Sequence, residues 1–283
     1  MKTVLVPTDF SDTAKNAAVF AIRLAEQVKA SKIVLYNAYQ VPVTIDPAMP
    51  VMQMVNIDEM KSISENGLHT LQAELMSLLP EGIMIESYSE FAVLSTNIDE
   101  VCTRVGAQLI VMGITGTGSG FEEVLIGSNT ISVVNRTKIP VLIIPAEVRY
   151  RTIKEILLVC DFRKVAESTP VQPILNILKD TEARLQVLNV STENIQNREE
   201  TLVQKEVLNK LLQPHLPGYH FINSDDFAES VNDFSDKNRV DLIITIPKKH
   251  GFFESIFKKS HTKQLAFHTR VPLLCIHEEE YER

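Results

Sequence analysis

The sequence has few cysteines, no long apolar run and no excess of basic residues, and each absence excludes a class of protein. Cys102, Cys160 and Cys275 are odd in number, far apart, and set in or beside apolar segments. We therefore expect reduced, buried thiols rather than a disulfide framework or a metal site. No apolar run reaches the length of a membrane span, and Met1-Lys2-Thr3 leads directly into a predicted strand with no signal-peptide pattern. These features predict a cytoplasmic protein with no membrane partner.

The charge distribution argues against nucleic acid as a partner. The formal net charge is −8 at pH 7, and residues 1–147 carry 9 Lys and Arg against 16 Asp and Glu. Residues 148–283 are almost balanced, with 19 against 20. Neither half offers the basic surface that binds a phosphate backbone. In the acidic first half, a phosphate group would have to be held by local backbone dipoles or a metal ion, because the overall field repels anions.

The chain repeats one plan twice. Val4–Phe10 and Ile156–Phe162 are apolar runs that end in Asp-Phe, and Thr137–Ile144 matches Thr269–Ile276 near the end of each copy. The offset falls from 152 to 132 residues, so the second copy is about twenty residues shorter. A repeat of this length indicates a duplicated domain rather than a solenoid unit. We expect domains at 1–147 and 148–283, joined by a short linker at 146–152.

Apolar strand patterns alternate with helical patterns in each half, which favours a parallel sheet with right-handed crossovers. Ser11 or Asp12 is expected to cap the first helix. The two final strands, 140–145 and 272–277, are expected to pair with each other across a pseudo-twofold axis and so bury both sheet edges. The other expected strands are 3–8, 32–38, 83–89, 108–113, 154–160, 183–190, 218–223 and 240–246. The expected helices are 12–29, 57–79, 94–105, 127–137, 168–179, 194–214, 226–238 and 260–269.

Two segments leave alternatives open. Residues 40–56 contain three prolines and three methionines, which indicates either a loop that covers the core or a lid over a ligand or partner. Residues 248–270 are locally basic. They form either a solvated helix and loop face or a site for an anion or an acidic partner.

A glycine-rich stretch, Val111–Gly120, begins within the expected strand 108–113 and is followed by Gly127-Ser128-Asn129-Thr130 at the start of the next expected helix. Glycines between a parallel strand and a helix let backbone N–H groups close around an anion, and the helix N-terminus adds a positive partial charge at the same point. The pattern is typical of phosphate binding, although isolated glycines also serve ordinary turns.

On these residues the first half resembles a universal stress protein domain, and the whole chain resembles a tandem universal stress protein. The ATP-binding pattern of that family is Gly-x-x-Gly, nine residues, then Gly-Ser or Gly-Thr, with an Asp that ends the first strand. Here Gly113-x-x-Gly116 and Gly127-Ser128 are present, separated by ten residues, and Pro7-Thr8-Asp9-Phe10-Ser11 matches the family opening. The resemblance is strong in the first half and weak in the second.

The resemblance implies an α/β fold of two tandem Rossmann-like domains (flavodoxin-like, or adenine nucleotide alpha hydrolase-like), each a five-stranded parallel sheet flanked by helices. It also implies a site for ATP, with or without Mg²⁺, or for a related adenine nucleotide. Asp9 would sit near the nucleoside with Pro7 and Thr8 beside it, and the backbone of Ala38 would approach the adenine. Ribose and phosphate contacts would come from Met112, Gly113, Gly116, Gly127, Ser128 and Asn129.

The residues support these roles by their own chemistry. A carboxylate at the end of the first strand lies at the edge where open α/β sheets bind ligands, and Asp9 there could accept ribose hydroxyls or help hold a divalent cation. Ser128 offers an N–H and a hydroxyl at a helix start. The alternative is that Asp9 only caps the next helix.

The second copy lacks the glycines. Pro247 follows its fourth strand and Lys259 stands where Gly127 stands in the first copy, so the site is predicted to be lost there. We expect a nucleotide-binding stress or signalling protein whose second half acts as a dimer-like partner, with slow ATP hydrolysis at most, because no base is clearly placed near the loop. The alternative is a protein-interaction module that binds no nucleotide. The protein partner, and whether the chain forms a homodimer, stay open.

Overall fold

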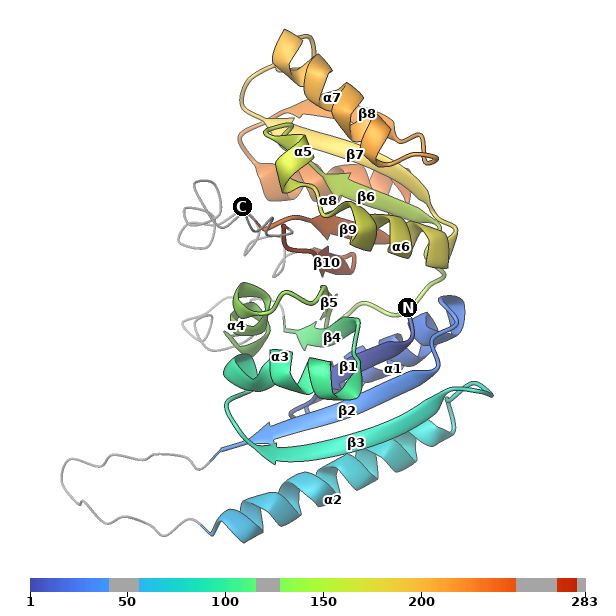
Figure 1. The fold of residues 1–283 in the computed structure, drawn as a ribbon, viewed down its shortest axis with the longest axis vertical. Helices are drawn as coiled ribbons and strands as arrows, with labels where there is room; N and C mark the ends of the chain where they lie inside the picture. The colour runs from blue at the N-terminus through green and yellow to red at the C-terminus, as the bar shows by residue number, and fades with distance from the viewer. Residues whose placement is uncertain (41–55, 116–127, 248–268, 279–283) are drawn as a thin grey trace, which may run out of the picture.

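A computed structural model describes residues 1–40, 56–115, 128–247 and 269–278 (Figure 1). The strands form one ten-stranded sheet in the order β3-β2-β1-β4-β5-β10-β9-β6-β7-β8. The sheet runs along the long axis of the molecule, with β3 at one end and β8 at the other (Figure 1). No helix in the described ranges is long and apolar enough to cross a membrane.

The first half of the chain supplies five neighbouring strands, β3-β2-β1-β4-β5, and all their pairings are parallel. Its strands are β1 (Thr3–Pro7), β2 (Lys32–Tyr39), β3 (Met84–Phe91), β4 (Leu109–Ile114) and β5 (Val141–Pro145). Its helices are α1 (Asp12–Gln27), α2 (Ile57–Met76), α3 (Leu94–Val105) and α4 (Ser128–Arg136). The central strands β1 and β5 are buried along their whole length. Continuous apolar runs form such strands because helices cover both faces of a parallel sheet.

Helix α1 follows the sequence expectation closely. The Ser11 side chain accepts a hydrogen bond from the N–H of Ala14, at 3.2 Å, and so caps the helix. Five buried alanines let the helix lie close to the sheet, and Phe20, Ile22 and Leu24 fill the remaining space. The predicted cap and the predicted apolar face are confirmed.

The second half repeats the arrangement as β10-β9-β6-β7-β8, again with parallel pairs. Its strands are β6 (Glu155–Val159), β7 (Arg184–Ser191), β8 (Gly218–Asn223), β9 (Leu242–Thr245) and β10 (Leu273–Cys275). Its helices are α5 (Val165–Ser168), α6 (Val171–Thr181), α7 (Glu199–Leu211) and α8 (Phe227–Asn238). The α/β fold class is therefore confirmed in both halves.

Some predicted boundaries in the second half are wrong. The expected helix 168–179 starts too early: it corresponds to α6, which begins at Val171, and Ser168 ends the separate short helix α5. Pro170 keeps the two helices apart, because the residue before a proline is disfavoured in the helical region and Thr169 lies at φ −93° and ψ 116°. The expected helix 194–214 is shorter, since α7 starts only at Glu199. The expected helix 260–269 lies outside the described residues except for Thr269, which is not helical.

The two halves meet in a single antiparallel strand pair, as the sequence predicts. Strand β10 pairs with β5, and Leu274 lies opposite Leu142. Each face of the sheet also carries one apolar cluster that contains residues of both halves. The helices α1, α2, α6 and α7 contribute to one cluster, and α3, α4 and α8 contribute to the other. The core thus continues across the junction.

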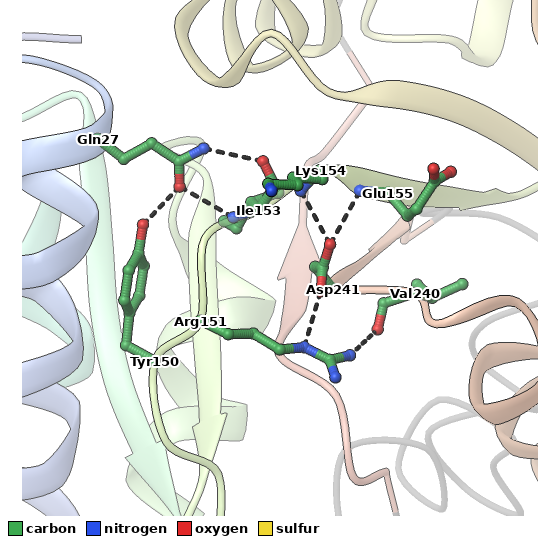
Figure 2. Close-up of polar contacts among 8 residues, drawn as sticks. All are labelled: Gln27, Tyr150, Arg151, Ile153, Lys154, Glu155, Val240 and Asp241. Carbon is green, nitrogen blue, oxygen red and sulfur yellow. Dashed lines mark hydrogen bonds and ion pairs between the residues drawn. The ribbon is translucent and has the colours of Figure 1, made fainter.

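A polar cluster fixes the linker between the halves (Figure 2). At the end of α1, the Gln27 side-chain oxygen accepts hydrogen bonds from the Tyr150 hydroxyl at 2.5 Å and from the Ile153 N–H at 3.0 Å. Its amide nitrogen donates to the Ile153 carbonyl at 2.8 Å and to the Thr181 carbonyl at 3.3 Å. One side chain of the first half therefore satisfies backbone groups of the linker and of α6.

Asp241 in the second half also binds the linker. Its carboxylate accepts hydrogen bonds from the N–H groups of Lys154 and Glu155, at 2.8 and 3.0 Å, and pairs with the Arg151 guanidinium at 2.7 Å (Figure 2). Arg151 also donates to the Val240 carbonyl. The linker is held between both halves by these contacts.

Candidate functional site

A hollow of about 380 Å³ opens at the carboxyl ends of β1, β2 and β4, beside the start of α4. This is the edge where open α/β sheets bind ligands, since the strand order reverses there. The volume lies in the range of about 300–1,000 Å³ that small-molecule sites occupy. The described residues that line it are Pro7, Thr8, Asp9, Ser11, Thr13, Ala14, Tyr36, Asn37, Ala38, Gln40, Val93, Leu94, Ser95, Met112, Gly113, Thr115, Asn129 and Thr130.

The turn after β1 holds Asp9 in place. The Asp9 carboxylate accepts hydrogen bonds from the Ser11 N–H at 3.0 Å and the Ser11 hydroxyl at 2.6 Å. Between them Phe10 has a φ of 67°, in the left-handed region that few non-glycine residues adopt. Phe162, its counterpart in the repeat, has a φ of 54°. The repeated Asp-Phe pair thus encodes a sharp turn that leaves the Asp at the sheet edge.

The turn also explains a glycine in α2. A Cβ placed on Gly67 would lie 2.6 Å from the ring of Phe10. Because α2 has a glycine there, the Phe10 ring can pack directly against the helix backbone.

Asn37 is a residue of this site that sequence reasoning missed. Its buried side chain donates to the Thr8 carbonyl at 2.6 Å and accepts from the Ser64 hydroxyl at 2.6 Å. Ser64 is in turn 2.6 Å from the hydroxyl of Ser89. This chain of hydrogen bonds ties the end of β1 to α2 and β3. The repeat itself held the clue, because Asn189, 152 residues later, donates in the same way to the Cys160 carbonyl at 2.8 Å.

A second polar group lies at the Tyr36 side of the hollow. The buried Tyr36 hydroxyl donates to Glu90 at 3.1 Å and accepts from the Asn97 amide at 3.1 Å. Burial raises the pKa of Tyr36 to about 12, and the Arg104 guanidinium, 2.8 Å from Glu90, holds the pKa of that carboxyl below its usual range. Tyr36 is therefore neutral at physiological pH, and Glu90 is ionised and already paired.

Gly113 is the last residue but one of β4 and lies in close contact with α1. A Cβ on this residue would lie 2.5 Å from the carbonyl oxygen of Thr13 and 2.6 Å from its methyl carbon. The Gly113 carbonyl accepts a hydrogen bond from the Thr130 hydroxyl at 2.9 Å, and the hydroxyls of Thr13 and Thr115 are 3.1 Å apart. The packing of α1 and α4 against β4 therefore requires a glycine here, whatever the hollow binds.

The structure brings most of the predicted site residues together. Seven of them line the hollow, and Ser128 is the first residue of α4. Gly116 and Gly127, with the ten residues between them, lie outside the described residues, as do residues 41–55. The seven lining residues are Pro7, Thr8, Asp9, Ala38, Met112, Gly113 and Asn129.

The hollow has a simple charge pattern. Among its described lining residues, Asp9 is the only Asp, Glu, His, Lys or Arg. The other polar groups are hydroxyls, amides and backbone groups, and the described residues contain no cluster of three or more His, Cys, Asp or Glu that could hold a metal ion. The three cysteines form no disulfide, and Cys102 and Cys275 are buried.

The second half has its own hollow of about 420 Å³, between the ends of β6 and β7 and the starts of α7 and α8. Its lining includes Asp161, the counterpart of Asp9, but also Arg163 and Arg198. Arg198 pairs with Glu193, another lining residue, at 2.5 Å. A cavity therefore persists where sequence reasoning predicted a lost site, although its lining is strongly charged. That prediction considered only the glycine loop, and this hollow is built from other segments.

Comparisons with known proteins agree with this picture. The model of the universal stress protein family matches residues 1–145. The chain is 29% identical over 143 residues to universal stress protein MJ0531 of Methanocaldococcus jannaschii, which covers 50% of this chain and 81% of that protein. It is 28% identical to universal stress protein Sll1654 of Synechocystis, over 51% of this chain and 85% of that protein. The crystal structure of a universal stress protein from Archaeoglobus fulgidus matches 98% of both chains with a TM-score of 0.73 and 18% identity.

Proposed function

The chain belongs to the universal stress protein family, and on this premise we propose that its first half binds one adenine nucleotide in the hollow beside Asp9. The ligand is ATP with Mg²⁺ or a related adenine nucleotide, and the second half serves as a built-in dimer partner through the β5–β10 pair. The bound nucleotide reports a stress or signalling state to a partner protein.

The observation that carries this proposal is the convergence of seven predicted binding residues on one hollow of about 380 Å³. Apolar groups of Ala38, Met112 and Leu94 line it, and such groups suit the faces of a base. The Asp9 carboxylate can accept hydrogen bonds from ribose hydroxyls.

The hollow is also lined by Thr13 and Thr115, which carry hydroxyls, and by Asn129 in the first turn of α4. Donors at a helix N-terminus are suited to a phosphate group. The chemistry of the lining therefore fits a nucleotide, with the base toward the end of β2 and the phosphates toward α4. Mg²⁺ would arrive with the nucleotide and neutralise part of its charge.

Isothermal titration calorimetry of the full chain with ATP and Mg²⁺ tests the proposal. We expect about one nucleotide per chain. Asn129→Glu, which puts a carboxylate in the first turn of α4, should weaken binding about tenfold or more, because like charges repel near the phosphates. An acidic residue in this turn favours the helix, so the variant should fold normally.

Gln172→Glu is the matched control, because Gln172 is exposed and, like Asn129, is the second residue of its helix. It adds the same charge at a residue that does not line the hollow, and should leave the affinity unchanged. Absence of binding by the wild-type chain would contradict the proposal and favour the protein-interaction module instead. Binding that Asn129→Glu and Gln172→Glu alter equally would place the nucleotide elsewhere.

A further inference from the structure

The hollow beside Asp9 is unusual for a polyphosphate site because none of the described residues that line it is cationic. Asp9 is the only charged residue among its described lining residues, and within the described part of the chain its carboxylate accepts hydrogen bonds only from the backbone and hydroxyl of Ser11. No described cation therefore neutralises its negative charge in an ion pair.

The two segments that follow the lining residues Gln40 and Thr115 in the sequence contain no basic residue either. In the sequence, residues 116–127 contain Glu122 and Glu123 and no Lys, Arg or His, and residues 41–55 contain Asp46 and no basic residue. Two basic side chains of adjacent helices are already paired, Lys15 with Glu74 at 3.4 Å and Arg104 with Glu90 at 2.8 Å. The first half as a whole carries 9 basic and 16 acidic residues. A bound anion thus meets backbone dipoles and hydroxyl groups in a negative field.

Such groups can compensate for little phosphate charge. The N-terminus of a helix acts as roughly half a positive elementary charge, whereas each phosphate group brings about one to two negative charges. The helix and the hydroxyl donors offset part of the charge of a single phosphate at the start of α4. Each further phosphate adds repulsion from Asp9, and no cation among the described lining residues offsets it.

We propose that this hollow selects adenine ligands by phosphate charge. Adenosine monophosphate binds more tightly than free ATP, and ATP binds well only together with a divalent cation. The inference rests on the proposed adenine-nucleotide site and adds which charge state of the ligand that site accepts. The protein would then respond to the ratio of monophosphate to magnesium-bound triphosphate and not to total adenine nucleotide.

Calorimetric titrations with AMP, with ATP in EDTA and with ATP in excess Mg²⁺ test the selection. We expect AMP to bind about tenfold or more tightly than free ATP. Mg²⁺ should remove most of this difference for ATP and change AMP binding little. Raising the salt concentration should narrow the gap, because screening weakens the repulsion of free ATP.

A charge placed at the start of α4 provides the sharper test. Asn129→Lys puts a cation in the first turn of α4, beside the hollow, and should strengthen the binding of free ATP about tenfold relative to AMP. Gln172→Lys adds the same charge at the same position of α6, outside the lining, and should leave the ratio as in the wild type. Both variants place a Lys at a helix start, so both should lose similar, small amounts of stability.

The outcomes are distinguishable. If affinity rises with the number of phosphates in EDTA, or if Asn129→Lys leaves the ratio of free ATP to AMP unchanged, the charge selection is wrong while the adenine-nucleotide site stands. If AMP, ATP and magnesium-bound ATP all fail to bind, the proposed function fails and this inference fails with it.

Discussion

Replacing Gly113 by Ala separates the packing role of this residue from its predicted contact with a ligand. The added Cβ would lie 2.5 Å from the carbonyl oxygen of Thr13, 2.6 Å from its methyl carbon and 2.9 Å from its carbonyl carbon. Two of these atoms belong to the backbone of the first turn of α1, so a side-chain rotation cannot relieve the contact. We expect a loss of about 1–3 kcal/mol in the free energy of unfolding, which is typical of overpacking.

Gly218→Ala is the matched control, because Gly218 is also a strand glycine and its added Cβ would meet only the ring nitrogen of His220, at 3.4 Å. Ordinary contact costs little, and loss of chain entropy in the unfolded state can add about 0.4–1 kcal/mol of stability. Urea denaturation of both ligand-free variants, followed by circular dichroism, measures the difference. If Gly113→Ala is as stable as Gly218→Ala, the close approach of α1 to β4 is wrong.

Three further predictions concern the junction, the polar group near the hollow and the thiols. Gln27→Ala removes four hydrogen bonds between α1, the linker and α6, and should lower the free energy of unfolding by about 2–6 kcal/mol at roughly 0.5–1.5 kcal/mol per bond. A loss below about 0.5 kcal/mol, measured by urea denaturation, would show that the linker contacts are weak. Arg104 lowers the pKa of Glu90 in the folded protein from its usual 4.5, so Glu90 stabilises the fold above that value and loses this effect as the pH falls. Glu90→Gln should therefore lose less stability than the wild type between neutral and acidic pH. Equal losses of stability would contradict the pairing of Glu90 with Arg104. Iodoacetamide should modify Cys160 before Cys102 and Cys275, because these two are buried and burial raises their thiol pKa values to about 12. Equal rates of modification of the three cysteines, read by mass spectrometry, would contradict the burial of Cys102 and Cys275.

Much of the fold follows from the sequence because the repeat is visible in it. The apolar runs of the two copies match the strands, and two final strands with the same Thr-x-x-Pro opening are expected to be equivalent in the two halves. Equivalent edge strands related by a pseudo-twofold axis meet antiparallel, which is how β5 and β10 pair. The start of α6 after Pro170 was also foreseeable, because the residue before a proline disfavours the helical region, but the prediction placed the start three residues too early, at Ser168.

The site was harder to predict, because its geometry depends on contacts between distant segments. The Asp-Phe turn and the glycine pattern indicated Asp9 and Gly113, yet nothing local to Gly113 reveals the backbone of Thr13 beside it. Asn37 was visible only as one half of a repeated pair with Asn189. The hollow of the second half was not predicted from the sequence. It lies between strand ends and helix starts, and such a cavity needs no particular sequence motif.

The most direct test of the central claim is hydrogen exchange of the full chain, read by mass spectrometry, with and without magnesium-bound ATP. One nucleotide in the first half should slow exchange in the segments that meet at the hollow, the turn after β1, the end of β2 and the start of α4. Exchange around the second hollow should not change. No protection anywhere, or protection centred on the turn after β6, would contradict the account.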